Sequence, residues 1–201
     1  MITNHTQLLN WLVDKYKLNS YLEVGVQSVY QNFSKIKVPS IHKVGVDPDP
    51  NVKYWCVKNT TSDQYFADYS DTFDLIFLDG DHTKEQIERD FNNAMKCLNT
   101  GGVVVIHDSL PENERGTIVP RETRQWWGSV YKFVMKLDSI PNIKHYTVNM
   151  DNGCTVVYKS SRPAMPTPFT GKSNRPSWQD YLDYKDTCYN IIQPSEIETY
   201  L

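Results

Sequence analysis

The sequence lacks a hydrophobic run long enough to cross a membrane. Its apolar stretches, such as Val103 to Ile106, fall far short of the roughly 20 residues that a membrane-spanning helix needs. The N-terminal residues, among them Asn4, His5 and Asn10, do not form the basic and then apolar regions of a signal peptide. We therefore expect a cytoplasmic protein that binds no membrane.

The sequence also lacks an excess of one charge and any paired cysteine motif. Its 21 lysines and arginines stand against 24 aspartates and glutamates, a net charge of −3, so no strong electrostatic field favours nucleic acid as a partner. The four cysteines contain no C-x-x-C pair. This spacing favours reduced thiols in the core over disulfides or a zinc site.

The composition is that of one ordinary folded domain. Of the 201 residues, 39% are hydrophobic and 22% are charged, which argues against disorder, coiled coil and collagen. Five of the eleven prolines lie within residues 160–201, a density typical of an extended arm with short helices. We expect a domain at residues 1–160 and an arm at residues 161–201 that packs on the body or on a neighbouring subunit of a homo-oligomer.

Short apolar runs alternate with helical patterns. Runs of nearly continuous hydrophobicity, typical of strands covered on both faces, occur at residues 21–26, 42–46, 73–78 and 102–106. Apolar residues at helical spacing mark 6–16, 84–98 and 123–137. The turn at Asp151-Asn152-Gly153 predicts an antiparallel hairpin of 143–148 with 154–159. The predicted fold is therefore α/β, a mostly parallel sheet between two helical layers.

Polar residues follow the ends of successive predicted strands. In open α/β sheets, ligands bind beyond the carboxyl ends of the strands. The rule selects Glu23, Gly25, Gln27, Asp47, Ser62, Asp63, Asp79, Asp81, His82, His107 and Asp108.

The first two strand ends indicate a nucleoside. Asp47 lies about twenty residues after Gly25, where nucleotide-binding sheets place an acid that accepts hydrogen bonds from ribose hydroxyls. A lone acid at such a position more often caps a helix, but together with Glu23-Val24-Gly25 it favours the ribose contact. The loop after Gly25 lacks the second and third glycines of G-x-G-x-x-G, and the sequence has no G-x-x-x-x-G-K-[ST] motif. A nucleoside cofactor without phosphates therefore fits better than NAD, and a dehydrogenase is disfavoured.

The ends of two further strands carry groups for metal or proton chemistry. Asp79, Asp81 and His82 lie within four residues of each other, and His107-Asp108 ends the neighbouring strand. Carboxylates there suit Mg²⁺, Mn²⁺ or Ca²⁺, and a histidine can act as general base near neutral pH. The alternative is that the acids only cap the helix that begins near residue 83.

In this order and spacing, the motifs resemble class I S-adenosylmethionine-dependent methyltransferases, in particular the bacterial group related to macrocin-type sugar O-methyltransferases. The resemblance covers about residues 21–159. Its carriers are YLEVGV at 21–26, VGVDP at 44–48, TSDQYF at 61–66, residues 73–82, residues 101–108 and WGSVYK at 127–132.

The resemblance implies a seven-stranded Rossmann-like sheet and a role for each strand end. Glu23, Gly25 and Gln27 would border the methionine part of S-adenosylmethionine, Asp47 would hold the ribose, and Ser62 and Asp63 would edge the adenine. Asp79 would adjoin the cofactor. Asp79, Asp108 and His107 would bind a divalent ion such as Mg²⁺, and His82 or Asp81 would be the catalytic base, with His82 favoured.

The function that the resemblance implies is O-methylation of a sugar or another small hydroxylated acceptor, as in glycan biosynthesis. The alternative is a non-catalytic protein on the same fold that binds the cofactor or a partner. Loss of methyl transfer with retained cofactor binding after Asp79→Ala would support the enzyme.

Overall fold

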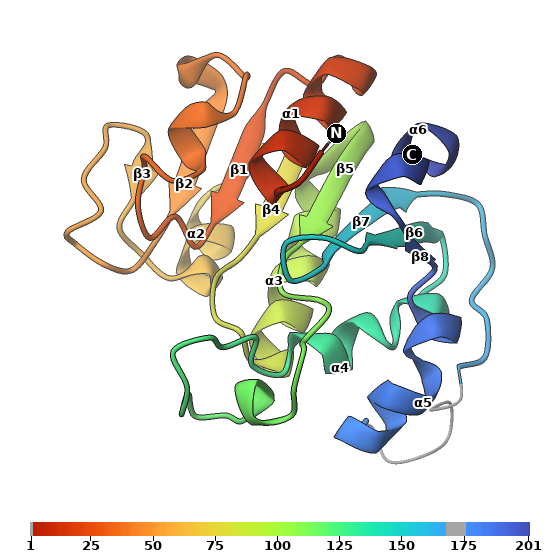
Figure 1. Cartoon of the computed structure of the whole chain (residues 1–201). Coiled ribbons are helices and arrows are strands. Elements are labelled where there is room, and N and C mark those ends of the chain that lie inside the picture. Colours follow the sequence, from red (N-terminus) through yellow and green to blue (C-terminus); the bar gives the residue numbers. More distant parts are fainter. Residues whose placement is uncertain (1, 168–175) are drawn as a thin grey trace.

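An eight-stranded mixed sheet runs through the centre of the molecule (Figure 1). The computed structural model describes residues 2–167 and 176–201. The strand order is β3-β2-β1-β4-β5-β7-β6-β8. The strands are β1 (Tyr21–Val24), β2 (Lys43–Val46), β3 (Val57–Lys58), β4 (Phe73–Leu78), β5 (Leu98–Ile106), β6 (Ile143–Val148), β7 (Cys154–Lys159) and β8 (Ile191–Ile192). The first five pair in parallel, and β7 runs antiparallel to both β5 and β6.

Helices cover both faces of this sheet. On one face lie α1 (His5–Tyr16) and α6 (Ile197–Tyr200), and on the other lie α2 (Ser62–Asp68), α3 (Lys84–Cys97), α4 (Val130–Val134) and α5 (Trp178–Cys188) (Figure 1). Short 3₁₀ turns occur at Phe33–Lys35, Ser40–His42, Arg115–Thr117, Leu137–Ser139 and Pro194–Glu196. No helix in the described residues is both long and apolar enough to span a bilayer.

The central strand β4 is apolar except at Asp74 because a helical layer covers each of its faces. In β4, Leu75 and Phe77 pack against the layer of α1, whereas Ile76 and Leu78 pack against the layer of α3. All four are buried. The predicted α/β fold with a mostly parallel sheet and an antiparallel hairpin is confirmed.

The C-terminal residues add a strand beyond the seven that were predicted. Ile191 and Ile192 form β8, which pairs in parallel with β6 at the edge of the sheet. Before it, α5 packs on the body, and the Tyr189 hydroxyl donates a hydrogen bond to the Tyr131 carbonyl at 2.9 Å. Pro168 and Phe169 of the predicted arm lie outside the described residues.

The helix predicted at 123–137 is shorter in the structure, where α4 begins only at Val130. Gly128 has a left-handed φ of +59°, and a Cβ there would overlap the carbonyl oxygen of His82. The chain turns at this point, and the Ser129 amide donates to that same carbonyl at 2.7 Å. The residues before Gly128 therefore form a loop beside the ends of the strands.

Candidate functional site

A cavity of about 780 Å³ lies at the carboxyl ends of β1, β2 and β4 and just after β5. Every predicted site residue except Glu23 lines it. These residues are Gly25, Gln27, Asp47, Ser62, Asp63, Asp79, Asp81, His82, His107 and Asp108. The loop before α4 forms another wall with Arg121, Arg124 and Trp126.

The turn after β1 lies tightly against the turn after β4. Gly25 has a φ of +88°, and a Cβ there would overlap the backbone carbonyl of Asp79. Only glycine fits this conformation and this space without strain. Because Gly25 has no side chain, its backbone is exposed to the cavity.

Asp47 ends β2 and is held by backbone amides. Its Oδ2 atom accepts a hydrogen bond from the Gln27 amide, and its Oδ1 atom accepts one from the Asp49 amide, both at 2.8 Å. The side chain is thus fixed in orientation while it lines the cavity. Because a carboxylate has about four acceptor positions, Asp47 keeps acceptors for a ligand.

Ser62 and Asp63 lie in the first turn of α2, at the far side of the cavity. The Gln86 side chain of α3 donates to the Ser62 hydroxyl and to Asp63 Oδ1, each at 3.1 Å. Thr61 caps α2 by accepting a hydrogen bond from the Gln64 amide. The first turns of α2 and α3 therefore form this wall, and hydrogen bonds from Gln86 hold them together.

His82 occupies the centre of the acidic part of the cavity. Its Nδ1 atom lies 3.2 Å from Asp108 Oδ2 and 3.2 Å from the carbonyl oxygen of Trp126, while Nε2 lies 3.5 Å from Asp79 Oδ1. The ring stacks on Trp126 with 5.1 Å between centroids. Burial lowers the pKa of His82, but the hydrogen bond to Asp79 and the charge of Asp108 outweigh burial and raise it.

Asp81, the other candidate base, has a different environment. It is exposed, and its Oδ1 atom accepts a hydrogen bond from the Thr83 amide at 2.9 Å. Thr83 in turn caps α3. These contacts are those of the helix-capping alternative, so the geometry favours His82 over Asp81 as the group that moves a proton.

His107 lies beside Asp79 just after β5. Its Nδ1 atom is 3.1 Å from Asp79 Oδ1 and 3.6 Å from Asp108 Oδ1. Burial lowers the pKa of His107, but the charges of Asp79, Asp108 and Asp151 raise it to about 10. Burial raises the pKa of Asp79, and its two histidine neighbours bring the net value below the usual range.

The predicted divalent ion can be tested against this donor set. Asp79, His82 and Asp108 each offer a ligand atom within 4.8 Å of the others, which is the size of a metal site. Mg²⁺, however, requires oxygen ligands in an octahedron, and here Asp79 and Asp108 are already paired with imidazoles whose raised pKa favours the cationic form. The donor set does not fit Mg²⁺ as it stands.

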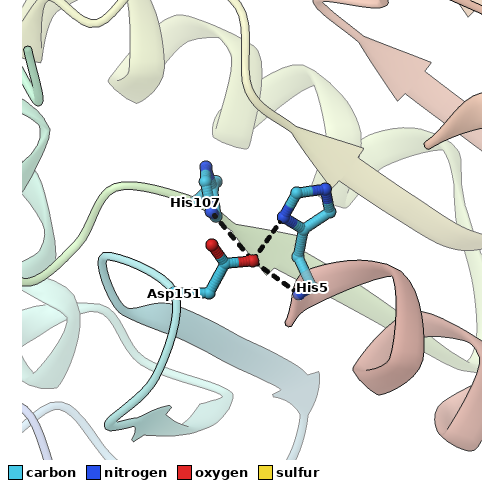
Figure 2. A group of neighbouring side chains, drawn as sticks. All are labelled: His5, His107 and Asp151. Atoms are coloured by element: carbon cyan, nitrogen blue, oxygen red, sulfur yellow. Dashed lines mark hydrogen bonds and ion pairs between the residues drawn. The ribbon is translucent and has the colours of Figure 1, made fainter. Parts of the chain in front are cut away.

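Two residues near this centre were missed from the sequence. Asp151 Oδ2 lies 2.6 Å from His5 Nδ1 and accepts a hydrogen bond from the His5 amide at 2.7 Å (Figure 2). On its other side it lies 3.9 Å from His107 Nε2. The sequence shows Asp151 only as a turn residue and His5 only as part of a polar N-terminus, and neither signal points to this cluster.

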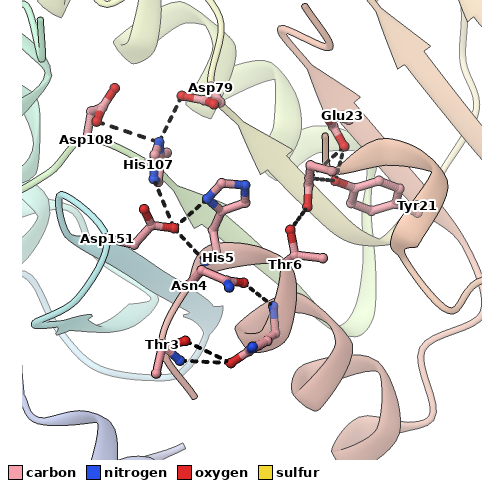
Figure 3. A network of polar contacts seen from close by, with 12 residues as sticks. Thr3, Asn4, His5, Thr6, Tyr21, Glu23, Asp79, His107, Asp108 and Asp151 are labelled. Carbon is pink, nitrogen blue, oxygen red and sulfur yellow. Dashed lines mark hydrogen bonds and ion pairs between the residues drawn. The ribbon is translucent and has the colours of Figure 1, made fainter. Parts of the chain in front are cut away.

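Glu23 is the one predicted site residue that does not line the cavity. Its buried carboxylate accepts hydrogen bonds from the Tyr21 hydroxyl at 2.5 Å and from the Asn32 side chain at 2.9 Å. Asn32 also accepts a hydrogen bond from Thr6, so a polar chain connects β1 to the first turn of α1 (Figure 3). Burial raises the pKa of Glu23 to about 8. Its contact with the cofactor stays a prediction.

The comparison with known families agrees with the fold and the position of the cavity. Residues 22–109 match the family described as a methyltransferase domain. This segment runs from β1 to the residues just after β5, so it holds all the predicted site residues. The match covers less than half of the chain, and together with the fold it agrees with the predicted similarity to class I S-adenosylmethionine-dependent methyltransferases.

Solved structures of O-methyltransferases share this fold. A candidate caffeoyl-CoA O-methyltransferase from Staphylococcus aureus has a TM-score of 0.63 at 17% identity, over 80% of this chain and 86% of that chain. TomG of Streptomyces achromogenes, solved with S-adenosylmethionine and involved in tomaymycin synthesis, has a TM-score of 0.58 at 18% identity, over 77% and 79%. An O-methyltransferase from Bacillus cereus, solved with S-adenosylhomocysteine, has a TM-score of 0.58 at 16% identity, over 77% and 80%.

Proposed function

We propose that this protein transfers the methyl group of S-adenosylmethionine to a hydroxyl group of a small acceptor, a sugar or another hydroxylated molecule. The observation that carries the proposal is His82, a half-buried imidazole held between two carboxylates in the cavity of a methyltransferase fold. A hydroxyl group must lose a proton when it is methylated, and His82 is the group in this cavity placed to accept it.

The walls of the cavity fit the cofactor in size and chemistry. Gly25 provides the close backbone approach that the methionine part requires, since a Cβ there would overlap Asp79. Asp47 has free acceptor positions for ribose hydroxyls, and Ser62 with Asp63 borders the adenine. When bound, S-adenosylmethionine supplies a methyl group activated by a positive sulfur.

His82 is oriented to act as general base through Nε2. Because Nδ1 faces two acceptors, Asp108 and the Trp126 carbonyl, the proton of the neutral ring lies on Nδ1. This leaves the Nε2 lone pair to take the proton of the acceptor hydroxyl. Asp79, 3.5 Å away, stabilises the resulting imidazolium, in the same way as an acid partner supports a catalytic histidine in other enzymes.

The acceptor enters beside the loop before α4. Trp126 is half-buried, stacks on His82 and lines the cavity, and an indole in a cavity wall is a suitable surface for a sugar ring. A sugar acceptor, with a role in glycan biosynthesis, rests on this aromatic wall and on the resemblance to macrocin-type enzymes. A phenolic acceptor stacks on the same indole and is the competing outcome of the test.

The test measures cofactor binding and methyl transfer separately. Calorimetry with S-adenosylmethionine comes first, followed by transfer of a labelled methyl group to panels of sugars, nucleotide sugars and phenols. We expect binding and a product heavier by one methyl group, both independent of Mg²⁺. Absence of cofactor binding would overturn the proposal. Binding without transfer to any member of the panels would instead favour the non-catalytic alternative.

A further inference from the structure

We infer that His5, His107 and Asp151 form a binding site for a transition-metal ion of the Zn²⁺ type at the start of α1. The three side chains come from three separate elements: the first turn of α1, the residue after β5, and the turn between β6 and β7. Each offers a ligand atom within 4.8 Å of the others (Figure 2). His5 and Asp151 do not line the cavity described above, so this site lies behind it.

The first argument is the unpaired nitrogen of His107. The residue is only 8% exposed, and its Nε2 atom is buried without a hydrogen-bond partner. The nearest acidic atom, Asp151 Oδ2, lies 3.9 Å away, beyond hydrogen-bond distance. Leaving a buried polar atom unpaired costs about 1–3 kcal/mol. A metal ion between Nε2 and Asp151 would give this atom a partner.

The second argument is the orientation of the same ring. His107 Nδ1 lies 3.1 Å from Asp79 Oδ1, so a proton on Nδ1 points to a carboxylate. Nε2 faces His5 and Asp151, and an ion that binds there displaces the Nε2 proton and takes its lone pair. Histidines that bind metals commonly donate their other ring N–H to a carboxylate, which fixes the tautomer and the ring, and Figure 3 shows His107 placed in this way between Asp79 and Asp151. Asp79 is therefore a positioning residue for the ion.

The third argument is the donor set and its spacing. Two imidazoles and one carboxylate suit zinc and similar ions better than Mg²⁺. Ligand atoms about 2.1 Å from a tetrahedral ion lie roughly 3.4 Å apart. The observed distances from Asp151 Oδ2 are 2.6 Å to His5 Nδ1 and 3.9 Å to His107 Nε2. Shifts below 1 Å would bring these two distances to that value, with a fourth position left for water.

An ion at this site would also fasten α1 to the sheet. His5 is the first residue of α1, and the helix is capped by Asn4 just before it. Thr6, the next residue, is joined through Asn32 to Glu23 in β1. The start of α1 would thus be held to the sheet both by the ion and by these hydrogen bonds. An ion that binds the folded chain but not the unfolded chain raises the melting temperature.

The test uses the full-length protein after treatment with a chelator. Calorimetry should show one equivalent of Zn²⁺ bound, Co²⁺ should give the intense visible bands of tetrahedral coordination, and Mg²⁺ should not compete. Asp151→Asn and His5→Gln should each weaken Zn²⁺ binding at least about tenfold, and Asp79→Asn should weaken it by about 10–100-fold through His107. Circular dichroism identifies any variant that fails to fold, and the Co²⁺ spectrum of the unmutated protein still tests the site.

One matched control and one comparison locate the ion. His42→Gln removes an exposed histidine and should keep Zn²⁺ affinity within about twofold of the unmutated chain, as expected of a distant residue. His82→Gln removes a neighbour of Asp79 and should weaken Zn²⁺ binding less than His5→Gln or Asp151→Asn does. The inference is overturned if Zn²⁺ does not bind, because a proton then occupies Nε2, or if His82→Gln weakens binding more than His5→Gln and Asp151→Asn do. Since neither assay requires methyl transfer, failure here is separate from failure of the proposed function.

Discussion

His82 Nδ1 lies 3.2 Å from Asp108 Oδ2, although the two residues follow different strands. The parallel pairing of β4 with β5 brings these strand ends together, with Leu78 opposite Ile106. Asp108 itself has a left-handed φ of 54°, so the chain bends immediately after β5 as it presents this carboxylate. The contact orients the imidazole.

Replacing His82 by glutamine should remove the general base. We expect His82→Gln to lower the rate of methyl transfer by about 10²–10⁴-fold, while the dissociation constant of S-adenosylmethionine changes little because the cofactor contacts lie at Gly25 and Asp47. Single-turnover kinetics and calorimetry would measure the two effects. Full activity in His82→Gln would assign the proton transfer to another group. Asp81→Asn is the matched comparison, and it should retain more activity than His82→Gln does.

The rate should depend on pH through His82. Its pKa is raised above 6.5, so the protonated ring persists above that pH, and the neutral, proton-accepting form appears only as the pH rises further. We therefore expect kcat/KM to increase with pH through an apparent pKa above 6.5. In Asp108→Asn the increase should move to lower pH, because one charge that raises the pKa of His82 is gone. An unchanged pH profile of kcat/KM in Asp108→Asn would contradict the electrostatic contact between His82 and Asp108.

Replacing Asp47 by alanine should weaken cofactor binding. The ribose would lose two hydrogen bonds of about 1 kcal/mol each, or roughly 10–100-fold in the dissociation constant. Asp47→Asn keeps part of the acceptor capacity and should lose less. Calorimetry on both variants checks the order, and the rate at saturating cofactor should stay near that of the unmutated protein. Equal affinity in all three proteins would exclude the ribose contact.

Alanine at Gly25 should disturb both stability and cofactor binding. A Cβ there would overlap the Asp79 carbonyl and would also face a φ of +88°. Gly101→Ala is a matched control, since Gly101 has a φ of +79° but nothing within 4 Å of an added Cβ. Backbone strain in the control should lower the free energy of unfolding by about 1–2 kcal/mol. Gly25→Ala should lower it by about 1–3 kcal/mol more, because its Cβ also overlaps the Asp79 carbonyl. Chemical denaturation of the two variants measures the difference in the free energy of unfolding. Equal decreases would mean that the turns after β1 and β4 can move apart to accommodate the added methyl group.

The order of strands and helices could be predicted because it depends on local patterns. Residues 73–78 are apolar except for Asp74 since both faces of β4 are covered, and that pattern is typical of a parallel sheet. The rule that ligands bind at carboxyl ends then located the cavity. Glu23 is the exception because it lies within β1, not after its end, and its side chain is buried next to Asn32.

Two features could not be read from local patterns. Apolar residues at helical spacing extend over 123–137, but Gly128 packs against the His82 carbonyl and delays the start of α4. Similarly, Ile191 and Ile192 are too short a run to predict a strand, and they form one because the edge of β6 is available for pairing.

The sequence by itself determined the alternation of strands and helices, the edge of the sheet where ligands bind and the class of chemistry that its acids and histidines allow. Tertiary structure alone decided which side chains form pairs. His5 and Asp151 are separated by 146 positions in the chain yet share a hydrogen bond. Their contact depends on where α1 crosses the sheet and where the hairpin turns, and because packing of distant elements sets both, no local pattern records it.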